Sequence, residues 1–344
     1  MDITIEHYEG DGSDWDAYVN SCPNATNYHR YGWRNVIEKS FGHKTHYLIA
    51  RNGNNQIRGV LPTVYIKSSL FGSYLISLPF FNYGGILCND LCTAKHLLHE
   101  SERVLQLLKA EYAEFRYLWQ NDLDLSTKQH KVTMILDLEE NAEAQWKALD
   151  AKVRNQVRKA EKSGLAAVAG HLELLDGFYE VFCRNMRDLG TPVYGKDFFR
   201  NILETFPETT RIISVMLAGK TIASGILTWF RDTLEVPWAS SISDYRDKCP
   251  NNLLYWEAIK YAIAQGSTKF DFGRSTPGEG TYRFKKQWGA EPVQLYWQYL
   301  LGDGEQLPEL NTKNPKYEMA IKIWQHLPLA MTNFLGPRIV KNIP

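Results

Sequence analysis

The chain has 344 residues, and at roughly 100–200 residues per domain this length predicts two domains. Lysine plus arginine number 39, as do aspartate plus glutamate, so the net charge is zero and no overall basic field points to DNA binding. Hydrophobic residues make up 44% and charged residues 23%, which excludes a disordered chain, a collagen and a disulfide-stapled miniprotein.

Predicted helices and strands alternate along the first part of the chain, which is typical of the α/β class. Asparagine and glycine between two apolar runs indicate a hairpin turn at 52–55, because these residues tolerate positive φ. The expected elements, in order, are helices Ser13–Asn20 and Tyr31–Ser40, strands His46–Arg51, Gln56–Ile66, Ser73–Leu78 and Gly84–Leu87, helix Thr93–Ala110, and strands Phe115–Trp119 and Val132–Leu138.

The second part repeats this alternation. The expected elements are helices Glu143–Leu149, Ala151–Ser163, Glu173–Leu189 and Asp197–Phe206, strands Arg211–Leu217, Thr221–Phe230 and Thr233–Ser240, helix Asn252–Gln265, and strands Lys269–Phe272 and Val293–Leu300. An amphipathic helix over Tyr317–His326 and an apolar end flanked by Arg338 and Lys341 follow. Two interpretations of this tail stay open, a helix packed on the second domain and an interfacial contact with a membrane.

An internal duplication is predicted from two hairpins, YLIARNGNNQIRGVLP and SVMLAGKTIASGILT. They align at a constant offset that pairs Gly53 with Gly219, Gly59 with Gly225, and Leu61 with Leu227. The order of elements after each hairpin is also the same. We therefore expect two domains with mixed sheets, at 1–140 and 141–304, followed by a helical tail at 305–344.

The cysteines, the N-terminal sequence and the long uncharged stretch indicate the expected location of the protein in the cell. The five cysteines are scattered without a CxxC pair, so neither a disulfide framework nor a zinc site is expected. His96 and His99 lack a convincing third ligand, and no metal is expected. The N-terminus does not resemble a signal peptide, and Pro79 with several glycines interrupts the long uncharged stretch 68–89. We expect a cytoplasmic protein, with peripheral contact at the inner face of the membrane left open.

A basic helix and a glycine-rich segment are the two candidate binding regions. In the helix KVRNQVRKAEKSG, Arg154 and Arg158 share one face, which suits either a solvated surface or an anion site. The segment FDFGRSTPGEGTYRFKKQWGA, 270–290, reads as a long loop after a strand, where α/β proteins bind ligands. Its candidate side chains are Asp271, Arg274, Ser275, Tyr282, Lys285 and Lys286.

The motifs RNQVRKAEKSG, NNLLYWEAIKYA and FDFGRSTPGEGTYRFKKQWGA resemble the FemAB-like acyltransferases, in particular the subgroup associated with PEP-CTERM/exosortase gene systems. GWRNVIEKSFGHKTHYLIAR and LFGSYLISLPFFNYGGIL are similar to the first domain of that subgroup, so the resemblance covers nearly the whole chain. The resemblance implies two tandem GNAT-like domains. It also implies an enzyme that transfers an acyl or aminoacyl group to an amine or hydroxyl of a cell-envelope or exopolysaccharide precursor.

The donor is left open by two departures from related enzymes. GNAT enzymes hold the diphosphate of acyl-CoA with a glycine-containing loop at the start of a helix, whereas YRDKCPNNLLYW at 245–256 has no glycine. The helical-hairpin insertion associated with tRNA contact in some members is also missing. Aminoacyl-tRNA, acyl-CoA and acyl-carrier protein all remain candidate co-substrates, and no bound cofactor is expected.

Residue type and place suggest the roles of the candidate side chains. We expect Asp271 to act as base or orienting group, Tyr282 as hydrogen-bond donor, and Arg274 with Lys285 on phosphates of donor or acceptor. Arg154 and Arg158 would hold a diphosphate, and Ser275 and Lys286 would also contact substrate. The other hypothesis is a non-catalytic, degenerate GNAT pair that binds a lipid-linked saccharide precursor or scaffolds an export complex.

Overall fold

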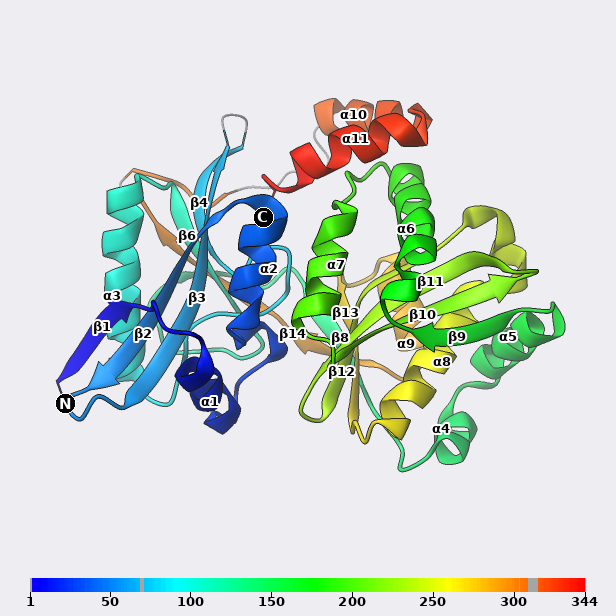
Figure 1. The fold of residues 1–344 in the computed structure, drawn as a ribbon, viewed down its shortest axis with the longest axis horizontal. Helices are drawn as coiled ribbons and strands as arrows, with labels where there is room; N and C mark the ends of the chain where they lie inside the picture. Colours follow the sequence, from blue (N-terminus) through cyan, green and yellow to red (C-terminus); the bar gives the residue numbers. More distant parts are fainter. Residues whose placement is uncertain (1, 69–70, 303, 309–314, 344) are drawn as a thin grey trace. The chain divides into compact units, whose positions relative to one another are not determined.

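The computed structural model describes residues 2–68, 71–302, 304–308 and 315–343. The chain forms two compact units. The first comprises Met1–His130, Gln294–Leu310 and Lys341–Pro344, and the second Lys131–Val293 and Asn311–Val340. Each unit contains one mixed sheet with helices packed on it, which confirms the expected α/β class (Figure 1).

The first unit is built on a sheet in the order β1-β2-β3-β4-β6-β15-β7, with β5 paired to β3. Its strands are β1 (Ile3–His7), β2 (Lys44–Asn52), β3 (Ile57–Ser68), β4 (Gly72–Ser77), β5 (Leu87–Cys88), β6 (Tyr112–Tyr117), β7 (Ser126–Lys128) and β15 (Tyr296–Leu301). Its helices are α1 (Ser13–Ser21), the 3₁₀ turn Asn27–His29, α2 (Gly32–Phe41) and α3 (Leu91–Leu108).

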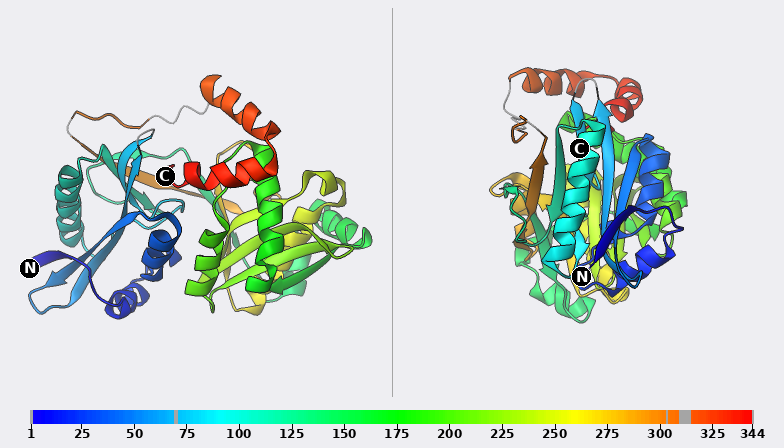
Figure 2. Two further views of the ribbon diagram at one scale, coloured as in Figure 1. Left: turned by 45° about the horizontal axis from the view of Figure 1, so that its top comes forward. Right: turned by 90° about the vertical axis from the view of Figure 1, so that its left-hand side faces the viewer.

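Alternating side chains of β2 connect this sheet to helices on both faces. Leu48 and Ala50 join the core beneath α3, which runs along one face of the sheet (Figure 2). Tyr47 points the other way and packs on Trp15 of α1, with ring centroids 5.0 Å apart. Both faces are therefore buried, which explains why β2 and β3 read as nearly continuous apolar runs.

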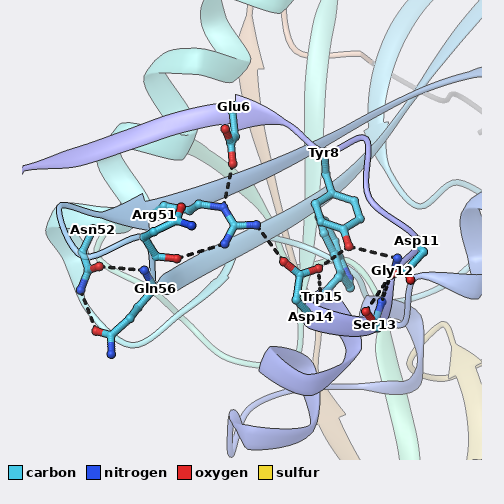
Figure 3. A network of polar contacts seen from close by, with 11 residues as sticks. Glu6, Tyr8, Asp11, Gly12, Ser13, Asp14, Trp15, Arg51, Asn52 and Gln56 are labelled. Atoms are coloured by element: carbon cyan, nitrogen blue, oxygen red, sulfur yellow. Dashed lines mark hydrogen bonds and ion pairs between the residues drawn. The ribbon is translucent and has the colours of Figure 1, made fainter.

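Strand β1 was not expected from the sequence and is attached by a polar network (Figure 3). Arg51 of β2 donates from Nε to Glu6 of β1 at 2.7 Å and from Nη2 to Asp14 of α1 at 2.8 Å. Tyr8 donates to the same Asp14 and accepts from the Gly12 amide at 3.0 Å. One guanidinium thus ties β1 and α1 to the β2–β3 hairpin.

The second unit has the sheet order β14-β8-β13-β12-β11-β10-β9. Its strands are β8 (Val132–Asp137), β9 (Ala166–Gly170), β10 (Thr210–Leu217), β11 (Lys220–Phe230), β12 (Thr233–Ser241), β13 (Lys269–Ser275) and β14 (Glu291–Gln294). Its helices are α4 (Ala142–Ala148), α5 (Ala151–Lys162), α6 (Leu175–Leu189), α7 (Lys196–Thr205), α8 (Pro250–Ala264), α9 (Gly280–Lys286), α10 (Pro315–His326) and α11 (Leu329–Val340), with 3₁₀ turns Leu172–Leu174 and Ser243–Lys248.

Helices α6 and α8 both pack on this sheet, and α5 packs on α8. The C-terminal helices α10 and α11 pack against α6, which confirms the first interpretation of the tail. Gly336 lets α11 approach the segment between α6 and α7 closely, because a Cβ at this position would lie 2.8 Å from the Val193 amide nitrogen. None of the helices in the described residues has the length and apolar character needed to cross a bilayer.

The two sheets share one topology but exchange strands. Each has a parallel central pair, β4–β6 or β12–β13, and an antiparallel strand beside it, β15 or β8. Strand β8 was expected in the first domain but pairs with β13, and the expected strand 293–300 divides into β14 and β15, which join different sheets. The division of the chain therefore differs from the expected boundary at residue 140.

The constant offset between the hairpins holds only from the turn onward. Gly59 and Gly225 are 166 positions apart in the sequence. Their partners on the preceding strands, Ala50 and Ile213, are only 163 positions apart. The reason is the turn, since five residues separate Arg51 from Ile57 whereas two separate Leu217 from Lys220. The duplicated hairpin thus carries a three-residue difference in its loop.

Candidate active site

The central parallel pair of the second unit ends in a fork. Strands β12 and β13 pair through only three positions, the last being Glu235 with Asp271. Beyond this point β12 continues along β11 to Ser241, and β13 continues along β8 to Ser275. Where the two strands diverge, backbone N–H and C=O groups on their facing edges have no partner in the sheet. Open α/β sheets bind ligands at such places. We call residues Glu235, Asp271, Gly273, Arg274 and Lys285 the fork.

Asp271 organises the backbone at the fork. The side chain is 2% exposed, and its Oδ1 accepts from the Thr133 hydroxyl of β8 at 2.6 Å and from the Gly273 amide at 2.7 Å. The second bond closes a tight turn at Gly273, whose φ of +75° is the left-handed region that favours glycine. Of the two expected roles, this geometry supports the orienting one.

Lys285 brings a positive charge to the two buried carboxylates. Its side chain is 8% exposed, and Nζ donates to the carbonyl oxygens of Gly273 and Arg274 at 2.9 and 3.0 Å. Burial lowers the pKa of Lys285 to about 8, although Asp271 and Glu235 oppose the change. This lysine therefore holds the end of β13, and its contacts differ from the expected contact with a phosphate.

The turn at Gly273 redirects the next side chains. The register of β13 against β8 shifts between Asp271 and Arg274, so that Arg274 is exposed while Ser275 is buried. The Ser275 hydroxyl has no hydrogen-bond partner within the described part of the chain. Expected as neighbours on one binding loop, Arg274 and Ser275 lie at positions of opposite exposure.

A second cation lies beside Arg274. Lys131, just before β8, donates to the Thr276 hydroxyl at 2.6 Å. Burial and the nearby Arg274 charge lower its pKa, while Glu279 opposes them. The positive charges of Arg274 and Lys131 are thus close enough to influence each other, an arrangement suited to an anionic group on a substrate.

The remaining candidates of segment 270–290 lie on a helix rather than a loop. Residues 280–286 form α9. Tyr282 is partly buried against the core of the second unit, and Lys286 pairs with Glu291 at 2.7 Å on the surface. The expected 20-residue loop is therefore wrong, because the run TYRFKK has the composition of a short helix.

The basic helix binds the end of α4. Arg154 donates from Nη1 to the carbonyl oxygens of Trp146, Lys147 and Leu149 at 3.4, 2.9 and 2.7 Å. Arg158 lies over the Trp146 ring, 5.4 Å from its centroid. The Arg154 bonds satisfy carbonyl groups that a helix end leaves free, so both arginines contact α4 in this structure, and a role in holding a diphosphate stays a prediction.

We expect the substitution Arg154→Met to destabilise the protein by about 1 kcal/mol, because carbonyl oxygens at the end of α4, two of them in part-buried hydrogen bonds, lose a charged donor. Transfer activity per folded molecule should stay within twofold of wild type. Urea unfolding followed by fluorescence, together with a transfer assay, checks both points. A large loss of activity without loss of stability would instead support the diphosphate role expected from the sequence.

Lys285 predicts a specific dependence of stability on pH. Its folded pKa of about 8 lies below the ordinary value of 10.5, so the folded state binds fewer protons between these values. The contribution of Lys285 to the free energy of unfolding should therefore rise with pH, by about 1–2 kcal/mol between roughly pH 8 and 9.5. The measurement is the unfolding free energy of wild type minus that of Lys285→Met across this range. A flat difference would contradict the lowered pKa.

Glu235, Thr133 and Lys131 were not identified from the sequence. Thr133 and Lys131 reach the site because β8 pairs with β13, a contact between segments about 138 residues apart. Glu235 lies in the apolar run LEVPW. A single charged residue in such a run is costly to bury, and this could have indicated a functional side chain.

At the corresponding end of the parallel pair, the described strands of the first unit have one carboxylate instead of two. Its last parallel pair is Ile76 with Glu114, so an isoleucine stands where Glu235 lies in the second unit. Glu114 is 4% exposed and receives a hydrogen bond from Arg116 Nε at 2.6 Å. Arg116 also donates to the Phe81 carbonyl oxygen at 2.5 Å and lies over the Trp297 ring, 4.4 Å from its centroid. At the corresponding position, the first unit thus has a buried ion pair with structural contacts.

One region of the chain is similar to a known protein family. Residues 148–286, which include the fork, match the Acetyltransferase (GNAT) domain family. The matched residues make up less than half of the chain and contain all five residues of the fork.

Particular relatives refine the comparison. The chain is 35% identical over 60 residues to the Lipid II:glycine glycyltransferase of Staphylococcus epidermidis, a match that covers 15% of this chain and 14% of that protein. The crystal structure of FemX superposes with a TM-score of 0.68 at 16% identity, over 87% of this chain and 98% of that one. A tandem GNAT protein from the clavulanic acid biosynthesis pathway superposes at 0.55 and 9% identity, over 87% and 98%. These likenesses confirm the expected fold of two GNAT-like units.

Proposed function

We propose that the protein transfers an aminoacyl group from an activated ester donor to an amine of a lipid-linked saccharide precursor of the cell envelope. The amine nitrogen would attack the ester carbonyl carbon, a C–N bond would form, and the C–O bond to the donor would break. The proton lost by the amine goes to a base, and the leaving oxygen takes a proton.

The fork carries this proposal. Glu235 and Asp271 are buried carboxylates in register on adjacent strands, with the Lys285 ammonium beside them. Asp271 already accepts two hydrogen bonds that shape the backbone, so we assign it as a positioning residue and Glu235 as the general base. Arg274 and Lys131 would bind an anionic group of donor or acceptor.

The start of α8 argues against acyl-CoA as donor. Pro250 occupies the first helical position and has no amide hydrogen, and the amides of Asn252 and Leu253 donate to the Cys249 carbonyl oxygen. A diphosphate needs several such amides at a helix start. This feature supports a donor other than acyl-CoA. The leading candidate is the ester of an aminoacyl-tRNA, and the other is the thioester of an acyl-carrier protein, for which a C–S bond would break and the thiol sulfur would take the proton.

The glycyltransferase relative supports an envelope acceptor, although the shared segment is short. An exopolysaccharide precursor and an association with PEP-CTERM systems stay predictions from the resemblance. Membrane contact by α10 and α11 likewise stays a prediction.

Turnover against a panel of donors tests the proposal. The purified full chain is incubated with an amine-bearing lipid-linked saccharide and, separately, aminoacyl-tRNAs, acyl-carrier proteins and acyl-CoAs, and amide formation is followed by mass spectrometry. We expect product from an aminoacyl or acyl ester other than acyl-CoA. Tight binding of the saccharide without product from any donor would favour the non-catalytic module.

Arg274→Lys tests whether the exposed guanidinium binds substrate. An arginine makes two parallel bonds to a phosphate or carboxylate, which lysine cannot reproduce, so kcat/KM should fall about tenfold or more. The melting temperature should stay near wild type because the side chain is exposed. If stability and activity fell together, Arg274 would instead pin the 274–279 segment.

A further inference from the structure

A cavity of about 200 Å³ lies within the first unit, apart from the fork. It forms where β5, the start of α3 and the segment 118–123 meet. Its walls combine apolar side chains such as Ile86 and Leu123 with the rings of Tyr117 and Trp119, which lie 5.9 Å apart. This volume is below the roughly 300–1,000 Å³ of sites that enclose a whole drug-sized ligand, so it would hold one ring of a larger molecule.

Hydrogen-bond donors in the wall are buried and available. The Nδ2 group of Asn121 is buried without a hydrogen-bond partner among the described residues, while its Oδ1 accepts from the Leu123 amide at 3.1 Å. Tyr117 is 2% exposed, and its hydroxyl oxygen accepts from the Ile86 amide at 3.2 Å, which leaves the hydroxyl hydrogen to donate. Gly85 permits this placement, since a Cβ there would lie 2.3 Å from the Tyr117 ring.

The charges around the cavity exclude an anionic ligand. Asp90 and Asp122 line it, and none of its described lining residues is a lysine, arginine or histidine. Bonds from Thr93 lower the pKa of Asp90, so this carboxylate stays charged. Burial raises the pKa of the Cys88 thiol to about 11, so the cysteine stays neutral. A phosphate or carboxylate would meet two carboxylates in the wall, and the Arg58 charge that also lowers the pKa of Asp90 is not among the lining residues.

We propose that this cavity binds one uncharged sugar ring. The hydroxyls of a pyranose supply donors for the Asp122 carboxylate and acceptors for Asn121 Nδ2 and the Tyr117 hydroxyl. Its C–H face suits an aromatic ring such as Trp119, whose π face carries partial negative charge. As a subsite for the saccharide of the acceptor, the cavity rests on the proposed function.

Binding of free sugars to the full chain tests the inference without any transfer step, so its outcome is independent of the donor assay. Saturation-transfer NMR and calorimetry would use methyl glucoside, methyl galactoside and N-acetylglucosamine, with glucose 6-phosphate and uridine as comparisons. We expect at least one uncharged sugar to bind and to weaken about fivefold or more in Trp119→Ala and in Asn121→Leu. Leu107→Ala, at an 81% exposed α3 position outside the cavity, is the matched control and should leave binding unchanged.

Asp122→Ala, an exposed side chain whose loss should not affect folding, keeps the test decisive if the aromatic variant unfolds. It should also weaken sugar binding severalfold. The inference is overturned if no uncharged sugar binds at roughly 10 mM, where a millimolar Kd would give near-saturation. It is equally overturned if folded variants bind like wild type, if the sugar phosphate binds more tightly, or if uridine alone binds.

Discussion

Arg116→Met should destabilise the protein by about 3–5 kcal/mol, the range measured when one partner of a buried ion pair is removed. Arg116 is 2% exposed, pairs with Glu114, donates to the Phe81 carbonyl oxygen and stacks on Trp297. Without it, the Glu114 carboxylate remains buried with its counter-charge gone. Urea unfolding of the full chain, with circular dichroism as readout, measures the loss.

The double variant Glu114→Gln/Arg116→Met controls for the size change. It removes the uncompensated charge, so we expect it to recover at least about 1 kcal/mol of the loss. A double variant as unstable as the single one would mean that packing on Trp297, and not the buried charge, dominates. A loss below about 1 kcal/mol in Arg116→Met would contradict the structural role of the pair.

Glu235→Gln should lower kcat about 100-fold or more while the unfolding free energy stays within about 1 kcal/mol of wild type. A positioned general base contributes typically 10²–10⁴-fold, and glutamine keeps the shape of the side chain without its basicity. The pH dependence of kcat separates this role from positioning. If Glu235 is the general base, its ionisation shapes the pH profile of the wild type and is absent from the profile of the variant. An unchanged pH profile with reduced kcat would make Glu235 a positioning residue.

Much of the fold could be predicted because the local sequence pattern indicates many of its helices and strands. The strands around Leu48 and Ile213 read as apolar runs, and the helices of 93–110 and 175–189 have clear periodicity and termini. Strand β9, AAVAG, carries no such signal, and β1, which pairs with β2 along its whole length, was missed as well. The exchange of β8 and β15 was beyond reach, because pairing between distant segments leaves no mark on local pattern.

The sequence directed attention to the segment that supplies most of the candidate site, but it did not predict the contacts of the individual side chains. Segment 270–290 was singled out by its glycines and charges, and Asp271, Arg274 and Lys285 do meet at the end of β13. Whether a charged side chain points outward or inward depends on the register shift at Gly273. The sequence therefore suggested phosphate contact for Lys285, which lies buried on two carbonyl oxygens. Arg154 shows the same limit, since its partners belong to a different helix.

A side-by-side transfer assay of Glu235→Gln and Glu114→Gln tests most directly the claim that the fork, in the second unit, performs the chemistry. Both substitutions neutralise a buried glutamate in the central parallel pair of a sheet, one in each unit. Rates are measured per folded molecule with the donor identified in the panel and a lipid-linked amine. We expect transfer to be lost in Glu235→Gln and retained within about threefold in Glu114→Gln. Retained transfer in the first variant, with loss in the folded second variant, would contradict the account and move the chemistry to the first unit.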